Sequence, residues 1–408
     1  MEKKLREYAA LLICKGVNIQ RGQPLNISAS VACADLVRLS AEAAYEQGAR
    51  EVTVNWTDDA LSRMKYLRAD EAVFETMPEW QGMMYDHHVD ENCAKLAIVS
   101  SDPEMLSGVD PVRIQKWQQA TGTRLERYRA AQMSNEFQWC IGAYASPTWA
   151  AKVFPRLEEA EAVARLWEAI FQTVRVRGDG GAIGRWEAFV ADMKRRLDIL
   201  NGHKFRTLTY KNSLGTDLKV ELPEGHYWSG ASEKTPGGVE FIANIPSEEV
   251  FTLPRRDGVN GRVVASKPLV LSGNIVEGIV MEFQNGRIVS AHADKGEEIL
   301  KKTLETDEGS SYLGEVALVP DDSPISNAGI LFYETLFDEN ASCHLAFGDA
   351  YPMIEGAARL SREEKLKLGI NQSFVHEDFM IGTPDLSIVG ETHSGEAVSV
   401  FVDGNFAF

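Results

Sequence analysis

Residues 24–55 read PLNISASVACADLVRLSAEAAYEQGAREVTVN and contain two strand-like segments with a helical segment between them. The strand-like segments, 24–29 and 51–55, are short and rich in apolar and β-branched residues. The helical segment, 35–47, ends at Gly48 and carries apolar residues along one face: Leu36, Leu39, Ala43 and Ala44. We therefore predict a strand-helix-strand unit with two parallel strands.

The rest of the first half repeats this alternation. We predict further strands at 94–100 and 137–142, and helices at 2–15, 111–131, 158–173 and 185–201. Alternating strands and helices favour a largely parallel sheet covered by helices. We place the end of this N-terminal α/β domain just after the last helix, so that it spans residues 1–203.

From residue 204 onward, short alternating strands such as 205–210 and 216–222 replace this pattern. A chain of 408 residues also exceeds the size at which one hydrophobic core usually stops growing. The predicted fold class is therefore α/β, with an N-terminal parallel-sheet domain followed by a β-rich α+β catalytic domain over 204–408. We expect the first domain to supply walls, a lid or a partner surface.

The composition is that of an ordinary soluble globular protein with an acidic surface. The chain has 44% hydrophobic and 25% charged residues and a formal net charge of −18. Nucleic acids and anionic membranes are bound chiefly through clustered Lys and Arg, so we expect neither as a partner. The first residues lack the apolar core of a signal peptide, and no window is apolar enough to span a bilayer.

Five cysteines are scattered along the chain with no C-x-x-C spacing. This argues against a disulfide framework and against a thiolate zinc site. A reducing cytoplasm is the simplest location for such a protein.

Residues 373–381 have the β-branched and aromatic content of a strand and contain an imidazole and two carboxylates. Because side chains alternate along a strand, His376 and Asp378 would project together, while Glu377 would point to the opposite face. An imidazole and a carboxylate on one face can bind one ion. The alternative is a strand with a solvent-exposed polar face and no ligand role.

Two adjacent acids, Glu248 and Glu249, lie between the apolar pairs 245–246 and 250–251. A buried carboxylate needs a cation. Strand alternation turns only one of the two toward a given site, and the residues alone leave open which one is a ligand. The other would be placed to act as a general base. An edge strand with both acids solvated is the alternative.

Other candidates follow in the second half. Glu315 opens the apolar segment 316–319, and His344 ends a polar run that begins at Asp338. Glu339 is a further possible ligand, although Asp338 or Glu339 would serve equally well as a turn cap. Tyr351 would donate a hydrogen bond to an oxyanion, or simply pack. Carboxylates and imidazoles in this number are typical of a hydrolytic two-metal site.

The chain resembles a known family, the two-metal exopeptidases typified by aminopeptidase T, aminopeptidase S and PepS. The resemblance begins at residues 16–25 and 41–50 and runs to the carboxyl terminus. In the second half, four motifs agree in order and spacing: residues 244–252, 258–261, 336–344 and 376–382. The segment 383–390 and the acidic Glu377 depart from the family pattern. These departures bear on which substrate is preferred and not on metal binding.

The resemblance implies a set of metal ligands: Glu249, Glu315, His344, His376 and Asp378. It places Glu315 as the bridge between two ions, and it puts Glu339 and Tyr351 on further site positions. It implies a metal-dependent aminopeptidase that acts on short peptides with a free amino terminus. Two divalent ions, Zn²⁺, Co²⁺, Mn²⁺ or Mg²⁺, would activate a bridging water, with Glu248 as general base and Tyr351 as oxyanion donor. It also implies a homodimer.

Two other functions use the same residues. A metal-stabilised binding module would close its coordination sphere with protein ligands, whereas a catalytic site keeps positions for water and substrate. A two-metal hydrolase of other amides or of phosphoesters would need basic residues nearby, and Arg255-Arg256 is the adjacent basic pair next to a ligand motif.

Several local motifs are set aside. Residues 178–184 miss the G-x-G-x-x-G spacing because Ile183 takes the third glycine position, so we predict an interdomain loop. The adjacent His87 and His88 would face apart on a strand, which suits a surface or gating role better than metal binding. H-E-x-x-H and G-x-S-x-G are both absent from the sequence, so neither a thermolysin-like site nor a serine nucleophile is expected.

Overall fold

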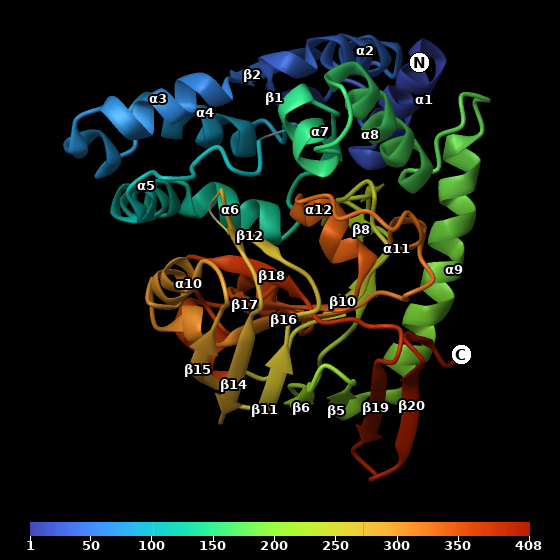
Figure 1. The fold of residues 1–408 in the computed structure, drawn as a ribbon. Helices are drawn as coiled ribbons and strands as arrows, with labels where there is room; N and C mark the ends of the chain where they lie inside the picture. The colour runs from blue at the N-terminus through green and yellow to red at the C-terminus, as the bar shows by residue number, and fades with distance from the viewer. Residues whose placement is uncertain (101, 272) are drawn as a thin grey trace. The chain divides into compact units, whose positions relative to one another are not determined.

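The computed structural model describes residues 1–100, 102–271 and 273–408, which group into two compact units (Figure 1). The first unit comprises Met1–Ala191 and Ser232–Ser247, and the second comprises Asp192–Ala231 and Glu248–Phe408. Helix α9 (Ala182–His203) crosses from the first unit into the second. The functional boundary expected after residue 203 stays a prediction.

The first unit is built on a parallel sheet of four strands in the order β2-β1-β3-β4. The strands are β1 (Pro24–Ser30), β2 (Glu51–Thr57), β3 (Ala94–Val99) and β4 (Trp139–Ala143). This confirms the predicted α/β fold class and the parallel strands. The other α-helices described in the unit are α1 (Glu2–Leu11), α2 (Ala34–Glu46), α3 (Asp59–Arg68), α4 (Glu79–Asp90), α5 (Pro111–Arg124), α6 (Glu126–Met133), α7 (Pro147–Val153) and α8 (Glu159–Thr173). Within the described ranges, no helix is long and apolar enough to cross a membrane.

The segment predicted as one helix over 111–131 forms two helices, α5 and α6, which meet at Leu125. The backbone of Leu125 (φ −100°, ψ 14°) lies outside the helical region. Thr121, Gly122 and Thr123 come just before this break, and glycine and β-branched residues have low helix propensity. The weak final turn explains why the helix does not continue.

The prediction that His87 and His88 lie on a strand was wrong, because both belong to helix α4. Successive helical residues are about 100° apart around the axis, since a turn holds 3.6 residues. His88 is accordingly buried and His87 exposed. Burial lowers the pKa of His88, so this imidazole favours its neutral form.

Of the glycine-rich residues 178–184, predicted as an interdomain loop, 178–181 lie in a loop and 182–184 begin α9. The loop lies inside the first unit, between α8 and α9. The Glu7 carboxylate accepts hydrogen bonds from the backbone N–H of Gly178 (2.5 Å) and of Ala182 (2.8 Å). Arg185 pairs with both Glu7 and Asp179. An acid at the start of α9 satisfies its free N–H groups and complements the helix dipole, so the loop serves as a helix cap.

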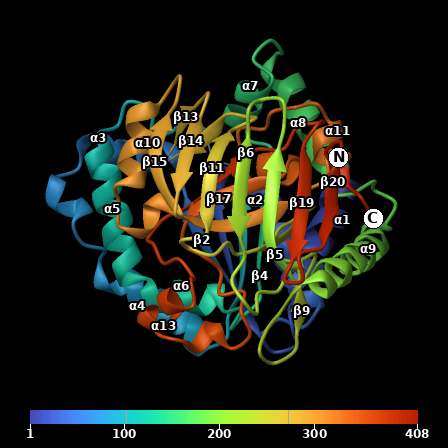
Figure 2. The same cartoon turned by 90° about the horizontal axis from the view of Figure 1, so that it is seen from below.

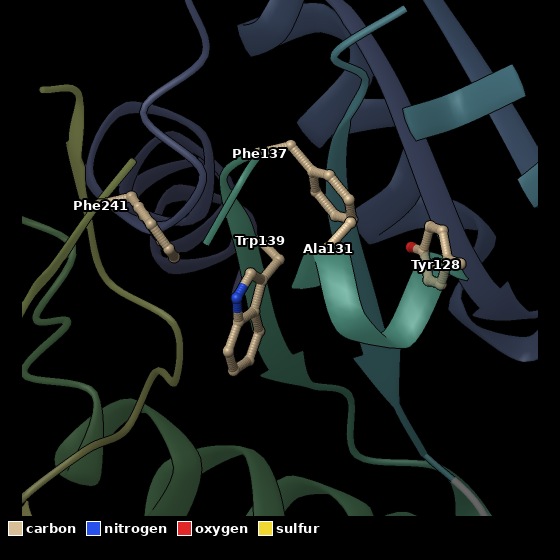
Figure 3. Packing of buried hydrophobic residues seen from close by; sticks show 5 residues of the cluster. All are labelled: Tyr128, Ala131, Phe137, Trp139 and Phe241. Atoms are coloured by element: carbon tan, nitrogen blue, oxygen red, sulfur yellow. The ribbon is translucent and has the colours of Figure 1, made fainter. Parts of the chain in front are cut away.

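The segment Ser232–Ser247 returns from the second unit to complete the first. It holds the short pair β8 (Glu233–Lys234) and β9 (Glu240–Phe241). Its backbone joins β4 through Ile141 N–H to Ala243 O (2.7 Å) and Ile245 N–H to Ile141 O (2.9 Å). Figure 3 shows Phe241 in the apolar cluster that this segment completes, with Tyr128, Ala131, Phe137 and Trp139.

Three elements of the first unit, β2, α3 and α4, expose large apolar side chains. Strand β2 is an edge of its sheet, and α3 has no buried residue among those described. We call these side chains the β2–α4 surface: Trp56, Leu61, Met64, Leu67, Trp80 and Met83. The most exposed are Trp80 (68%), Leu61 (64%) and Met83 (61%).

The second unit is mainly antiparallel, as predicted for the second half of the chain. Its eight-stranded sheet has the order β15-β14-β11-β6-β5-β19-β20-β21, and Figure 2 shows β14, β11, β6, β5, β19 and β20 side by side. These strands are β5 (Phe205–Lys211), β6 (Asp217–Glu221), β11 (Val259–Val264), β14 (Val280–Gln284), β15 (Arg287–His292), β19 (Ser387–Thr392), β20 (Ala397–Val402) and β21 (Asn405–Phe406).

A second antiparallel sheet of this unit has the order β18-β17-β16-β10-β7. Its strands are β7 (Ser229–Gly230), β10 (Val250–Thr252), β16 (Leu313–Leu318), β17 (His344–Gly348) and β18 (His376–Met380). The unit also holds the pair β12 (Leu269–Leu271) and β13 (Asn274–Val276), and helices α10 (Glu297–Leu304), α11 (Pro324–Asn327), α12 (Thr335–Asp338) and α13 (Arg362–Lys367).

Candidate metal centre

One face of the five-stranded sheet collects the side chains that were predicted to bind metal. Residues directly opposite each other in an antiparallel pair share a face. Glu315 on β16 lies opposite Ala346 on β17, which in turn lies opposite Asp378 on β18. His344 and His376 stand two residues before Ala346 and Asp378, so strand alternation brings both imidazoles to the same face.

The ligand atoms form two groups that share one carboxylate. Glu249, Glu315 and His344 make the first group, and Glu315, His376 and Asp378 make the second. In each group, one ligand atom from every residue lies within 4.8 Å of the others. The predicted association of His376 with Asp378 on β18 is therefore present.

The two carboxylate oxygens of Glu315 face different imidazoles. Oε1 lies 3.8 Å from Nε2 of His344, and Oε2 lies 3.5 Å from Nε2 of His376. Glu249 Oε2 approaches the same His344 nitrogen at 3.0 Å. Asp378 Oδ1 lies 4.0 Å from His344 Nε2 and 3.7 Å from His376 Nε2. Glu315 thus contributes to both groups, with one oxygen nearest the imidazole of each.

Backbone carbonyls orient both imidazoles. His344 Nδ1 lies 2.9 Å from the carbonyl of Glu339 and 3.1 Å from that of Ser342, and His376 Nδ1 lies 2.7 Å from the carbonyl of Asp349. A carbonyl oxygen only accepts, so each Nδ1 carries the proton and donates it. Each Nε2 is then the ring atom that faces the carboxylates, and a carbonyl partner at Nδ1 is the usual arrangement around a metal-binding histidine.

Burial and crowding change the pKa values of these groups. Burial raises the pKa of Glu315 to about 7. It also raises the pKa of Glu339 well above its ordinary value, and the neighbouring Asp378 and Glu249 add to this. Burial alone would lower the pKa of His376, but the attraction of Asp378 and Glu315 outweighs it and raises that pKa to about 9. Burial and crowding therefore favour the protonated forms of Glu315 and Glu339 and the charged form of His376.

A comparison with protein families agrees with this arrangement. Residues 1–406 match the family described as thermophilic metalloprotease (M29). This chain belongs to that family.

Relatives of the metalloprotease match it from end to end. It is 47% identical to aminopeptidase AmpS of Bacillus subtilis (strain 168), over all of this chain and 99% of that protein. It is 42% identical to aminopeptidase T of Thermus aquaticus, over 99% of this chain and 98% of that protein. The solved structure of wild-type AmpT from Thermus thermophilus covers all of both chains, with a TM-score of 0.91 and 40% identity.

A more distant structure shares the fold alone. 2,5-Dihydroxypyridine dioxygenase from Pseudomonas putida KT2440 covers 99% of this chain and 96% of its own, with a TM-score of 0.54 and 12% identity.

The residues of the metalloprotease fit divalent ions. Asp378 Oδ1 is a buried oxygen with no hydrogen-bond partner among the described residues, although it lies within 4.0 Å of both imidazoles. Buried polar atoms are normally satisfied, so an oxygen of this kind needs an explanation. Carboxylate oxygens and neutral imidazoles are the donors that Zn²⁺, Co²⁺ and Mn²⁺ accept. A cation between these groups would satisfy Asp378 and balance the charge.

Glu248 and Glu249 are both buried just before β10, but they are placed differently. Glu249 belongs to the first ligand group, and Glu248 belongs to neither group. The backbone N–H of Glu248 donates to Oδ1 of Asn340 (2.7 Å), and Nδ2 of Asn340 donates to Oε1 of Glu339 (3.2 Å). Asn340 thus holds two acids of the site. It was not singled out from the sequence, although its position beside Glu339 was a signal.

Glu339 and Asp338 have separate surroundings. Asp338 accepts hydrogen bonds from the backbone N–H of Phe332 (2.9 Å) and Glu334 (3.2 Å), so it has the turn-capping position considered from the sequence. Glu339 is buried, and its pKa responds to Asp378, Glu249, His344 and Glu315, which places it beside the ligand groups without belonging to either.

Tyr351 packs against a ligand of the second group. Its ring lies edge-on to the His376 imidazole, with 5.6 Å between the centroids, and 5.6 Å from the ring of Phe251. We call the sheet face that carries Glu315, His344, His376 and Asp378 the ligand face. The predicted site residue Tyr351 is therefore next to the ligand face.

The basic pair considered for phosphoester binding is engaged elsewhere. Arg255 pairs with Glu221 (3.0 Å) and Asp257 (2.7 Å). Arg256 pairs with Glu308 (2.8 Å) and lies over the ring of Tyr312. Both guanidinium groups are already bound to carboxylates, which argues against a phosphate-binding role.

Proposed function

We propose that this metalloprotease is a metal-dependent aminopeptidase that hydrolyses the amino-terminal residue from short peptides. The observation that carries the proposal is Glu315, whose two oxygens face the two imidazoles of two adjoining ligand groups. Relatives named as aminopeptidases match this chain over essentially its whole length, which supports the substrate class.

The two ligand groups would hold two divalent ions, with Glu315 between them. Glu249 and His344 would complete the site on one side, and His376 and Asp378 on the other, with Glu339 as a further ligand. Bound Zn²⁺, Co²⁺, Mn²⁺ or Mg²⁺ would polarise the scissile carbonyl and lower the pKa of a bridging water from ~15.7 to ~7.

The protein's own groups would move the protons and hold the substrate. The Glu248 carboxylate would accept the proton of the attacking water, since it lies beside Glu249 without belonging to a ligand group. Tyr351 Oη would donate a hydrogen bond to the carbonyl oxygen as negative charge develops on it. Carboxylates around the site would bind the free ammonium of the substrate.

The experiment strips the protein with a chelator, adds Co²⁺, Zn²⁺, Mn²⁺ or Mg²⁺ in turn, and counts bound ions per chain by elemental analysis. Release of p-nitroaniline is then followed from Leu-p-nitroanilide and from its N-acetylated form. We expect two ions per chain and cleavage of the free-amine substrate alone. Two bound ions without cleavage of either compound would overturn the aminopeptidase and favour a structural metal site.

A pair of variants tests the bridge. Glu315→Ala should lose bound metal and turnover together. Glu298→Ala removes a glutamate of the same unit that is 80% exposed on α10, and it should keep both. If Glu315→Ala does not fold, Glu315→Gln preserves the side-chain shape and should still lose metal. Full metal content and activity in either Glu315 variant would exclude the bridge.

We also propose a homodimer formed through the β2–α4 surface. Large exposed apolar side chains are typical of association surfaces, and an exposed edge strand such as β2 can pair with another copy. Sedimentation should give twice the mass of one chain. Leu61→Glu combined with Trp80→Glu should yield monomers, whereas Glu51→Ala, at the start of the same edge strand, should not. A double variant that stays dimeric would place the interface elsewhere.

The remaining expectations follow from the same proposal. Residues 204–408 would form the catalytic domain, because every candidate ligand lies there, and residues 1–203 would supply walls, a lid or a partner surface. A cytoplasmic location is supported by the five cysteines, all of which are free thiols. The net charge of −18 supports a protein that binds neither nucleic acid nor membrane.

A further inference from the structure

An aromatic side chain shares the ligand face and has no role in the chemistry proposed above. Phe251 on β10 lies opposite Ala317 on β16, and Ala317 lies opposite His344 on β17. The three side chains therefore share one face of the sheet. Ala317 contributes only a methyl group between the phenyl ring and the imidazole. Glu249 stands two residues before Phe251, so the ring and this ligand also project to the same side.

Phe251 is only partly buried, although its neighbours Val250 and Thr252 are almost fully buried. Its ring meets that of Tyr351 at a centroid distance of 5.6 Å and an interplanar angle of 55°. Tyr351 in turn meets His376 edge-on at 5.6 Å. A continuous set of rings thus leads from Phe251 to a ligand of the second group.

Behind these rings lies an apolar cluster. Phe251 and Tyr351 pack with Ile354 and Leu360 against its buried members: Leu253, Ala350, Met353, Ala357 and Ile370. No member of the cluster carries a charge. We call the cluster, with Phe251 and Tyr351, the apolar wall. The ligand face thus adjoins two kinds of surface, buried carboxylates at Glu248 and Glu339 and the uncharged apolar wall.

We propose that the apolar wall receives the side chain of the substrate's amino-terminal residue, that Phe251 determines its specificity, and that peptides beginning with a large apolar residue are the preferred substrates. This rests on the proposed aminopeptidase function. When the ammonium and the scissile carbonyl are held at the ligand groups, the first side chain branches from the carbon between them. It must then lie beside the ligand face, where the apolar wall offers an uncharged surface.

The chemistry of the wall sets the preference. Leucine or phenylalanine would bury its side chain against Phe251 and gain the hydrophobic contribution of the buried area. Alanine is too short to gain this. Arginine or lysine would place its charge against a surface that offers no carboxylate, which disfavours binding. One methylene in an apolar pocket changes kcat/KM by about 10–200-fold, so the preference for leucine over alanine should be at least about 10-fold.

The test compares kcat/KM for the p-nitroanilides of leucine, phenylalanine, alanine and arginine in wild-type protein and in Phe251→Ala, each loaded with metal. The leucine-to-alanine ratio should fall by about 10–100-fold in the variant. Titration calorimetry of the same proteins with L-leucine and L-alanine gives a second measurement, and the ratio of the two Kd values should fall in parallel. Phe251→Leu, which is smaller but still apolar, should retain the preference for leucine over alanine.

The matched control is Phe406→Ala, which removes a partly buried phenylalanine from β21, in the eight-stranded sheet of the same unit. It should keep the wild-type ratio. If Phe251→Ala keeps the ratio, or loses bound metal and slows every substrate equally, Phe251 does not determine specificity. If wild-type protein cleaves alanine and leucine substrates equally, the inference also fails while the aminopeptidase stands. Failure to cleave any free-amine substrate would instead overturn the aminopeptidase function itself.

Discussion

The two units bury charge in opposite ways. The parallel sheet of the first unit is packed with apolar side chains such as Ile27 and Leu96, and it carries Lys95 on β3. The Lys95 ammonium donates to Gln132 (3.2 Å) and lies over the ring of Tyr128, and burial lowers its pKa to about 8. The five-stranded sheet of the second unit instead concentrates acids and imidazoles on one face. The first unit thus holds a single, partly buried amine that can lose its charge, whereas the second gathers several acids around two imidazoles.

The largest expected effect that tests this contrast is removal of metal. Bound ions neutralise the acids of the second unit, and a ligand at 1,000 times its Kd stabilises a folded protein by about 4 kcal/mol per site. Chelation should therefore accelerate hydrogen exchange of the β16, β17 and β18 amides and leave β1 and β3 nearly unchanged. Equal acceleration in both sheets would show that bound metal stabilises both units alike, which would contradict this contrast.

The converse prediction concerns the core of the first unit. Ile27 on β1 is fully buried, so Ile27→Ala should lower the free energy of unfolding by about 2–5 kcal/mol without changing the affinity for metal. Denaturant unfolding and calorimetric metal titration measure the two quantities. Val31→Ala, at a half-exposed position next to the same strand, should stay within about 0.5 kcal/mol. A weakened metal site in Ile27→Ala would mean that the two units are coupled.

A smaller effect tests the spacing of the ligands. Ala346 is fully buried and lies between Glu315 and Asp378 across the strands. Ala346→Val would push two methyl groups among the carboxylates, and such overpacking costs about 1–3 kcal/mol. We expect the Kd for metal to rise by about 10–100-fold in calorimetry. Ala29→Val adds the same atoms to β1 of the first unit and should leave that Kd unchanged.

The smallest expected effect concerns pH and Lys95. The pKa of Lys95 is about 8 in the folded protein and 10.5 ordinarily. Between pH 8 and pH 10.5, the unfolded chain therefore binds more protons at this residue than the folded chain does. Stability of the first unit should rise with pH across this window, by about 1–2 kcal/mol. The rise should disappear in Lys95→Met and persist in Lys116→Met, whose ammonium pairs with Glu71 and Glu75. Urea unfolding at pH 7.5 and 10 measures it. A rise of the same size in Lys95→Met would exclude this origin.

Strand alternation was enough to predict part of the site from the sequence. It placed His376 and Asp378 on one face because both residues lie on a single strand. It could not choose between Glu248 and Glu249, because the choice depends on the direction of the chain just before β10. Nor could it show that Glu315 faces two imidazoles, because this depends on the pairing of β16 with β17 and of β17 with β18.

The errors in the predicted fold have similar causes. Periodicity alone extended α5 through Leu125, where weak helix formers end it, and it gave no helical signal around His87 and His88. The assignment of Ser232–Ser247 to the first unit depends on contacts with β4, more than 90 residues earlier in the chain. Local patterns carry no information about pairing over that distance.

The path of Ser232–Ser247 has a consequence for protein synthesis. Domains usually fold in order as they leave the ribosome. Here the first unit is not complete until residue 247 has been translated, and by then β5, β6 and β7 of the second unit have already been translated. Until then, the cluster around Trp139 lacks Phe241, and β4 lacks its hydrogen bonds with Ala243 and Ile245. The nascent chain must keep the first unit open while the first strands of the second are made.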